Sequence, residues 1–233
     1  MRLSLRPLLA VILLMFFTGC LTIEENYVFK KDGSGTMEYV VDLSEMGELM
    51  KSFEDASKDG GEGGASDLST MDMEEEVAAL QKIPGIQKVK VNKKVEWVQR
   101  VSFKFKDLVA LNAALNVLMP DSSGTTTEFF KWEGNDLVRI NNDHAYELGA
   151  GMAESANEGE EQAEEGSDMD MSAMLETMKY KFSFKFAQPL GTVVSAPEVT
   201  AERPGTKEFR METDFGVIGK DRKALDLRFP LNK

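Results

Sequence analysis

The sequence predicts an α+β domain, in which hairpins form an antiparallel sheet and three to four helices pack on one of its faces. Several runs alternate apolar and polar residues with period two, as half-buried strands do. Turn-forming segments such as Asp32-Gly33-Ser34-Gly35 and Glu133-Gly134-Asn135-Asp136 join neighbouring runs, as in hairpins. Other stretches place apolar residues at helical spacing. Flexible Gly-rich and acidic inserts interrupt this pattern.

The N-terminal half predicts two strand pairs with helices between and after them. Ser44 and Asp107 are suitable N-caps, and each precedes apolar residues at helical spacing. The stretch at about 58–67 is rich in glycine and cannot bury itself, so we expect a flexible insert there. In chain order the predicted elements are strands 22–31 and 36–43, a helix from Ser44, a helix over about 70–83, strands 86–91 and 95–105, and a helix from Asp107.

The C-terminal half predicts a hairpin, a long insert, a short helix and further strands. The insert covers about 142–170, and between Glu154 and Asp170 it carries eight acidic residues and no basic one, which favours a disordered, solvated loop. The predicted elements are strands 129–132 and 137–140, a helix over 171–178, and strands 180–186, 192–195, 208–215 and 223–229.

Residues 1–19 have the features of a secretory signal peptide. Arg2 and Arg6 give a positive start, residues 8–17 are apolar, and small residues precede Cys20, the only cysteine. The apolar run is too short to cross a bilayer, which takes about 20 residues. The segment resembles the signal peptide and lipobox of bacterial lipoproteins. This resemblance implies cleavage between Gly19 and Cys20, followed by S-diacylglyceryl and N-acyl (palmitate-type) modification of Cys20.

Composition limits the classes of function. Without residues 1–19 the chain has a formal net charge of −15, because Arg2 and Arg6 are the only charged residues removed. A strongly acidic domain disfavours nucleic-acid binding. With Cys20 acylated, no cysteine remains for a disulfide, a thiolate metal site or a nucleophile. We expect residues 20–233 to form a single domain.

Catalytic candidates are few, and we predict that the protein is not an enzyme. His144 is the only histidine, and its sequence neighbour Asp143 does not make an oriented dyad, so we interpret it as a solvated loop residue. The chain has neither a Gly-x-Ser-x-Gly elbow nor a phosphate-binding glycine loop. A hydrolase that uses His144 is the remaining enzymatic alternative.

No cofactor or metal site is predicted. Asp32-Gly33-Ser34-Gly35-Thr36 lacks the glycine and glutamate of a calcium loop, so it is interpreted as a turn. Thioethers bind Cu(I), but methionine is also an ordinary core residue, and helical spacing of three of the residues favours the core. The methionines that raise the copper alternative are Met71, Met73, Met169, Met171, Met174 and Met178.

A further resemblance is to the LppM-type lipoprotein domain. It rests on the strand that directly follows Cys20, on Asp32-Gly33-Ser34-Gly35 and Val41-Asp42-Leu43-Ser44, on the junction Phe103-Lys104-Phe105-Lys106-Asp107-Leu108, and on Gln188-Pro189-Leu190. The resemblance implies an exported α+β domain whose sheet and helices enclose an amphiphile. It supplies no catalytic residue.

The sequence therefore favours a non-enzymatic lipoprotein of the bacterial cell envelope, tethered by Cys20 and binding a small amphiphile or a protein partner. Leu21 follows Cys20 in place of an aspartate retention signal, so we expect the outer membrane, with the domain facing the periplasm or the cell surface. An assembly factor that presents its acidic insert to a basic partner is the alternative. Phe182 and Phe184 either belong to the core or line a binding pocket.

Overall fold

The computed structural model describes residues 21–48, 51, 73–120, 124–160 and 171–231, of which 152–160 and 171–172 are described by their backbone alone. Within them, seven strands form one sheet, three form a second, and helices flank both. The helices are α3 (Glu74–Leu80), α4 (Leu108–Leu118), α5 (Asp143–Glu160), α6 (Met171–Thr177) and α7 (Phe215–Ile218), and residues 44–48, where a helix was expected from Ser44, are also helical. The strands are β1 (Thr22–Phe29), β2 (Gly35–Asp42), β3 (Ile86–Asn92), β4 (Val98–Phe105), β5 (Phe130–Glu133), β6 (Asp136–Arg139), β7 (Lys179–Phe186), β8 (Thr200–Gly205), β9 (Glu208–Asp214) and β10 (Leu227–Pro230).

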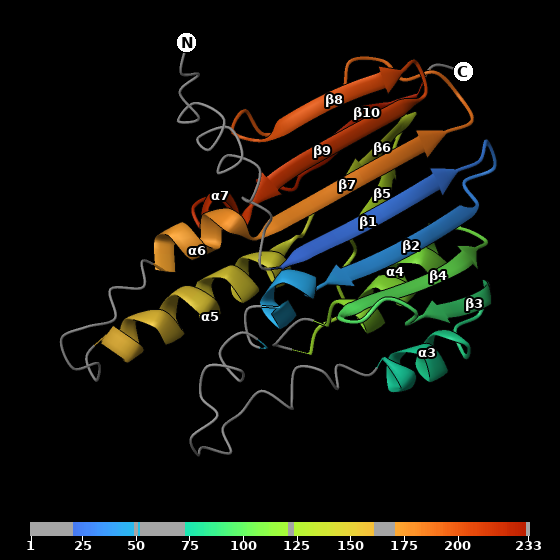
Figure 1. Ribbon diagram of the computed structural model, residues 1–233. Helices are drawn as coiled ribbons and strands as arrows, with labels where there is room; N and C mark the ends of the chain where they lie inside the picture. The colour runs from blue at the N-terminus through green and yellow to red at the C-terminus, as the bar shows by residue number, and fades with distance from the viewer. Residues whose placement is uncertain (1–20, 49–50, 52–72, 121–123, 161–170, 232–233) are drawn as a thin grey trace, which may run out of the picture.

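The large sheet has the order β3-β4-β2-β1-β7-β9-β8 and the small sheet the order β10-β6-β5. All neighbouring strands are antiparallel except β1 and β7, which pair in parallel along eight residues. Figure 1 looks onto one face of the large sheet, with the small sheet and α4 behind it and α5, α6 and α7 towards the end where β1 begins. The predicted α+β class is confirmed.

The core lies between the two sheets, where the apolar side of each alternating strand faces inward. In β7, Tyr180, Phe182, Phe184 and Phe186 are buried, while the residues between them are partly or fully exposed. β1 and β4 follow the same alternation. Each buried aromatic side chain stabilises the fold by roughly 1.5–3 kcal/mol relative to its exposure. The period-two pattern read from the sequence therefore identifies the core face.

Helix α4 shows how sequence signals set local structure. Asp107 has an extended backbone and its Oδ1 accepts a hydrogen bond from the Ala110 amide at 2.9 Å, so it is the predicted N-cap. The helix buries Leu111, Ala114 and Leu115 against the sheets. Further along, the side chains of Asn112 and Asn116 hold the chain that leads into β5 by hydrogen bonds to Phe130 and Thr127.

Replacing Asp107 with Ala should lower the free energy of unfolding by about 1 kcal/mol, because the Ala110 amide in the first turn of α4 loses its side-chain acceptor. Urea unfolding followed by circular dichroism measures this change. Asp107→Asn is the matched control, since it retains an oxygen acceptor and should cost much less. Equal losses for both variants would contradict the capping role.

Three parts of the fold differ from the sequence-based expectations. Residues 143–160, inside the stretch expected to be an unstructured insert over 142–170, form helix α5. Strand β8 was not predicted, and the expected strand 192–195 contributes only a bridge between Val194 and Arg228. The hairpin 130–139 belongs to a second sheet. Residues 161–170 and the glycine-rich insert at 58–67 lie outside the described residues, as does the signal segment 1–19.

Candidate functional site

Gly19 and Cys20, the predicted cleavage and lipid-attachment residues, lie outside the described residues. The first described residue, Leu21, is buried, and β1 begins at Thr22. The chain thus enters the middle of the large sheet at once. Among the described helices, none combines the length and apolarity needed to span a bilayer.

His144 lies in the first turn of α5, where the sequence analysis expected a solvated loop, so that interpretation is wrong. Its Nε2 is 3.1 Å from the Tyr180 hydroxyl, and its ring packs edge-on against Phe129. Burial, with a smaller contribution from the charge of Arg139, lowers the pKa of His144 to about 3. His144 is therefore neutral at physiological pH. The aspartate beside it, Asp143, instead pairs with Arg222 at 3.1 Å.

Tyr180 connects His144 to a buried ion pair that bridges the two sheets. Glu25 of β1 and Arg139 of β6 are fully buried, and Arg139 Nη2 donates to Glu25 Oε1 at 2.7 Å. The hydroxyls of Tyr27 and Tyr180 also donate to the Glu25 carboxylate. Burial and the charge of Glu25 raise the pKa of both tyrosines, so they remain donors.

The Arg139 guanidinium is enclosed by aromatic rings. Its central carbon lies 4.6, 5.2 and 5.6 Å from the ring centroids of Phe182, Phe130 and Phe129. Its Nε and Nη1 atoms are buried and have no hydrogen-bond partner among the described residues. Burial works against its charge, but Glu25 together with Tyr27 and Tyr180 outweighs this effect, and the pKa of Arg139 is raised. The guanidinium is thus held by one carboxylate and three aromatic contacts.

Perturbed pKa values often mark active sites, but this cluster has the character of a structural bridge. Both of its charged groups are fully buried, so no substrate reaches them in this structure. Each charge comes from a different sheet, and removing one would leave the other uncompensated. Nothing in the described part of the chain positively indicates catalysis.

Acid should destabilise the protein partly through His144. The folded protein keeps the imidazole neutral down to about pH 3, whereas the unfolded chain takes up a proton near pH 6.5. Stability from this group is therefore present above pH 6.5 and is lost as the pH falls. Between pH 6.5 and 5, the wild type should lose up to about 2 kcal/mol more than His144→Gln. Urea unfolding at several pH values measures the difference, and parallel profiles would contradict it.

The described methionines support the core interpretation over copper binding. Met178 is fully buried, and Met73 and Met174 pack against the core. Met71 and Met169 lie outside the described residues, as does the side chain of Met171. Among the described residues, no three histidine, cysteine or acidic side chains are grouped as a metal site would require.

Phe182 and Phe184 belong to the core. Their side chains are 2% and 0% exposed, and Phe184 contacts the rings of Tyr27 and Phe229 at centroid distances of 5.0 and 4.6 Å. Aromatic contacts thus fill the space where the amphiphile pocket would lie.

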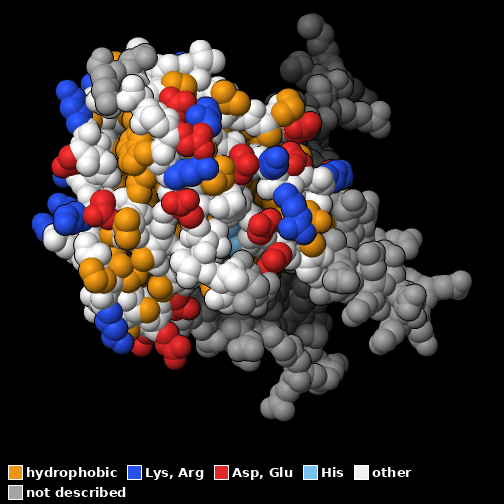
Figure 2. Space-filling view, turned by 180° about the vertical axis from the view of Figure 1, so that it is seen from behind, with side chains coloured by type: hydrophobic (Ala, Val, Ile, Leu, Met, Phe, Trp, Pro, Cys, Tyr) orange, Lys and Arg blue, Asp and Glu red, His pale blue; other side chains and the backbone are white. Residues whose placement is uncertain are grey.

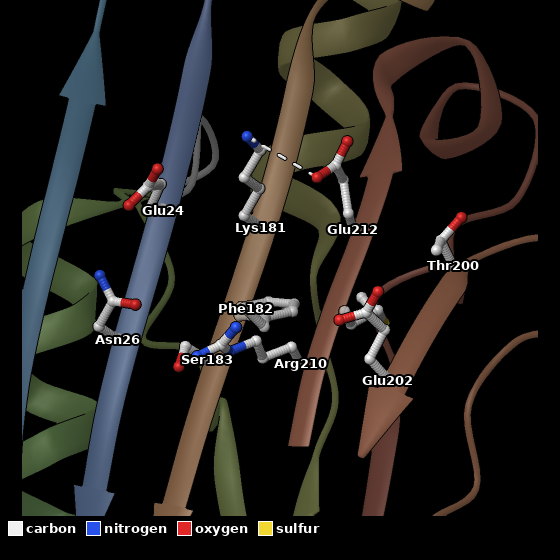
Figure 3. Close-up of a pocket in the computed structure, with 10 residues that line it drawn as sticks. Glu24, Asn26, Lys181, Phe182, Ser183, Thr200, Glu202, Arg210 and Glu212 are labelled. Atoms are coloured by element: carbon white, nitrogen blue, oxygen red, sulfur yellow. Dashed lines mark ion pairs between the residues drawn. The ribbon is translucent and has the colours of Figure 1, made fainter. Parts of the chain in front are cut away.

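The opposite face of the large sheet carries an open groove of about 450 Å³. Its polar lining comes from β1, β7, β9 and β8 (Figure 3). Phe182 and Met211 also border it, although their side chains are buried beneath the sheet. The polar residues that line the groove are Glu24, Asn26, Lys181, Ser183, Thr200, Glu202, Arg210 and Glu212.

Charges in this groove are only partly paired. Lys181 Nζ lies 3.7 Å from Glu212 Oε2, in an exposed pair that contributes little to stability. Arg210 stands between Ser183 and Glu202 in the strand register and extends across β7 towards Ser183 in Figure 3. With the described residues, neither Arg210 nor the groove acids Glu24 and Glu202 form an ion pair. Three charged groups are thus available to a partner.

On the opposite side of the molecule, the described surface carries no large patch of charged side chains of one sign. In Figure 2, basic and acidic side chains alternate over the described surface, with hydrophobic side chains scattered among them. Nucleic-acid binding would require a continuous basic patch, which this face lacks.

Comparison with known proteins adds a distant structural likeness. No protein-family model and no curated protein matches the chain. A solved structure, the NMR structure of the folded domain of the Mycobacterium tuberculosis protein LppM, is similar to 92% of this chain and 91% of its own, with a TM-score of 0.47 and 8% sequence identity. At these values neither a family nor a function follows from the likeness.

Neither the buried ion pair nor the groove was predicted from the sequence. Glu25 occupies the inward phase of β1 together with Ile23, Tyr27 and Phe29, and a charged residue in that phase was a usable signal. Arg139 likewise follows the apolar residues Leu137 and Val138 at the end of β6, and a charged residue there was a comparable signal. The groove had no comparable signal, because it depends on which strands become neighbours.

Proposed function

We propose that the protein is a lipid-anchored, non-catalytic envelope lipoprotein that binds a basic protein partner through the open face of its large sheet. Cys20 supplies the anchor in this proposal, and the folded domain supplies the docking surface. Among the described elements, no helix or strand covers this face (Figure 1). The observation that carries the proposal is the partly unpaired charged groove on that face.

The character of the groove favours a protein over a small amphiphile. Small-molecule pockets are mostly apolar and enclose their ligand. This groove is open and lined mainly by polar and charged side chains, like the polar part of a protein interface. The apolar interior, where an acyl chain would have to lie, is occupied by Tyr27, Phe184 and Phe229.

Docking on the sheet face is also favoured over strand addition at its edges. Edge strand β3 contains lysines and a register shift between Gln87 and Lys90. Edge strand β8 contains Pro204 and a shift between Glu202 and Gly205. Proline, lysine and bulges are the usual means by which edges are protected from pairing.

Charge complementarity favours a basic protein as the partner. The precursor has a formal net charge of −13, and two of the three unpaired groove charges are the acids Glu24 and Glu202. A basic protein surface is attracted to such a domain and associates faster at low ionic strength. Arg210 then offers a site for one carboxylate of the partner.

The anchor is tested with the full-length precursor expressed in a bacterial host. Labelled palmitate should enter the wild-type protein, which should sediment with membranes. Cys20→Ser should lose both properties while the domain stays folded. Palmitate labelling that survives in Cys20→Ser would refute the proposed attachment site.

The partner is tested by site-specific photocrosslinking from Ser183 in the groove, with exposed Val109 of α4 as the matched control position. The partner crosslinked from Ser183 alone is then identified and purified. The double variant Glu24→Lys/Glu202→Lys should weaken its binding by about tenfold or more at low salt. Unchanged affinity would overturn the proposal, as would a stoichiometric amphiphile found by native mass spectrometry of the chain from Leu21 onward.

A further inference from the structure

A second cleft, of about 270 Å³, lies between loops at the end of the sheet where β1 finishes. It is separate from the groove, and no residue is shared between them. The β1–β2 turn, the β5–β6 hairpin and the segments after β7 and β10 contribute its walls. The residues that line it are Lys31, Asp32, Gly33, Trp132, Gly134, Asn135, Gln188 and Leu231.

Trp132 is the main apolar surface of this cleft. Its side chain is 44% exposed, and it forms no hydrogen bond with the described residues, so its indole N–H is available. The indole lies beside Gly33, where an added Cβ would be 3.9 Å from both Cζ2 and Nε1. Gly33 has φ +81°, a turn conformation that favours glycine, and it leaves the ring uncovered by a side chain. A single exposed tryptophan is ordinary by itself.

The polar groups around this ring distinguish the cleft from an ordinary surface. Asp32 Oδ1 accepts hydrogen bonds from the Ser34 amide at 3.0 Å and its hydroxyl at 2.7 Å, and these bonds lower the pKa of Asp32. The carboxylate therefore stays ionised, and Oδ2 remains an acceptor. The side-chain amides of Asn135 and Gln188 make no hydrogen bond with described residues, and each offers donors and an acceptor.

We propose that this cleft binds a neutral oligosaccharide. A sugar ring presents an apolar C–H face, which fits against an indole, and hydroxyls that both donate and accept hydrogen bonds. The amides and Asp32 can satisfy such hydroxyls, and the indole N–H supplies one further donor. The opposite charges of Lys31 and Asp32 leave the cleft without a net charge, which suits an uncharged ligand. Its size and open shape correspond to one or two rings of a longer chain.

The position of the cleft indicates the source of the sugar. The eight residues of β1 separate it from the start of the domain by about 26 Å. If Cys20 is the anchor, as proposed above, the cleft faces away from that membrane. A polysaccharide in the envelope space can then reach it, whereas a glycolipid headgroup of the same membrane cannot. Sugar binding itself does not depend on the anchor.

Tryptophan fluorescence provides a direct test, because the chain contains only Trp97 and Trp132. The Trp97→Phe variant of the chain from Leu21 onward reports on Trp132 alone. Trisaccharides of glucose, mannose and N-acetylglucosamine are titrated to about 10 mM, and at least one should give a saturable change with a Kd of about 1 mM or below. The absence of any saturable change would overturn the proposal.

Variants then assign the binding to this cleft, with calorimetry as the readout. Trp132→Ala and Gln188→Ala should each weaken binding of the same trisaccharide at least about tenfold. Val109→Ala, at an exposed apolar residue on α4, should leave the affinity for the trisaccharide unchanged. Wild-type thermal stability of Trp132→Ala would show that it folds. Equal affinity of Trp132→Ala and wild type would overturn the assignment.

The source of the sugar is tested with the Trp97→Phe protein, anchored to lipid vesicles through Cys20. Soluble trisaccharide should change the fluorescence of Trp132, while the same sugar on a lipid of the same vesicle should not. A response to that glycolipid would overturn the assignment to an envelope polysaccharide. Failure of the protein to attach to vesicles would instead count against the anchor, since the soluble titration does not require it.

Discussion

Replacing Glu25 with Ala should destabilise the domain by about 3–5 kcal/mol, because the fully buried Arg139 would lose the one carboxylate that pairs with it among the described residues. The hydroxyls of Tyr27 and Tyr180 would lose their acceptor in the same change. Many domains have a total stability of only 5–15 kcal/mol. Urea unfolding of the chain from Leu21 onward measures the loss.

A double-mutant cycle measures the interaction energy between Glu25 and Arg139 separately from the contacts that each makes with other residues. Arg139→Met should also destabilise strongly, since it leaves Glu25 as an uncompensated buried charge. The double variant Glu25→Leu/Arg139→Met should recover a large part of the loss, because an apolar pair of similar volume removes both charges from the core. Additive losses in the double variant would show that the two residues act independently, contrary to the geometry. Glu24→Ala, at the half-buried neighbour on the open face of β1, is the matched control and should change stability by less than about 0.5 kcal/mol.

Replacing Phe184 with Ala should cost about 3–5 kcal/mol, because the side chain is fully buried and the cavity left behind cannot collapse completely. Its ring stacks on Tyr27 and lies 4.6 Å from that of Phe229, so three strands lose a shared contact. Thermal and urea unfolding both measure the change. We expect Phe182→Ser to be similarly severe, because Phe182 covers the Arg139 guanidinium.

The neighbouring Lys185→Ala is the matched control for Phe184. Lys185 points to the open face, where its pair with Glu208 spans 3.5 Å and is largely exposed, so its loss should cost less than about 1 kcal/mol. Wild-type stability of Phe184→Ala together with lost ligand binding would contradict the core assignment. That result would restore the hypothesis of an aromatic-lined pocket.

The sequence predicted those parts of the fold that depend on local patterns. Strands β1, β2, β4 and β7 largely alternate with period two, β1 and β2 are joined by a turn that contains Gly33, and Asp107 caps α4 as its position before an apolar stripe indicated. These features are fixed by residues close together in the chain. The α+β class followed from them.

Features that depend on distant pairing were not accessible in the same way. The parallel pairing of β1 with β7 joins Thr22 to Lys179, and the pairing of β10 with β6 joins Leu227 to Arg139. Helix α5 is polar and contains glycine, so its composition favoured disorder. Its Gly149 lies against Phe215, where an added Cβ would be 3.3 Å from the ring, so this glycine permits close packing. The groove and the cleft arise from the same long-range arrangement.

The position of β1 determines how the domain responds to a pull. Both flanks of β1 are hydrogen-bonded along all eight residues, so tension on Leu21 directed along the strand must shear two ladders simultaneously. Strand β10 has only four residues; it pairs with β6 on one side and is held on the other by isolated bridges, such as that between Val194 and Arg228. A lipid tether on Cys20 would therefore load a strand held by two eight-residue ladders, longer than the ladder that holds β10.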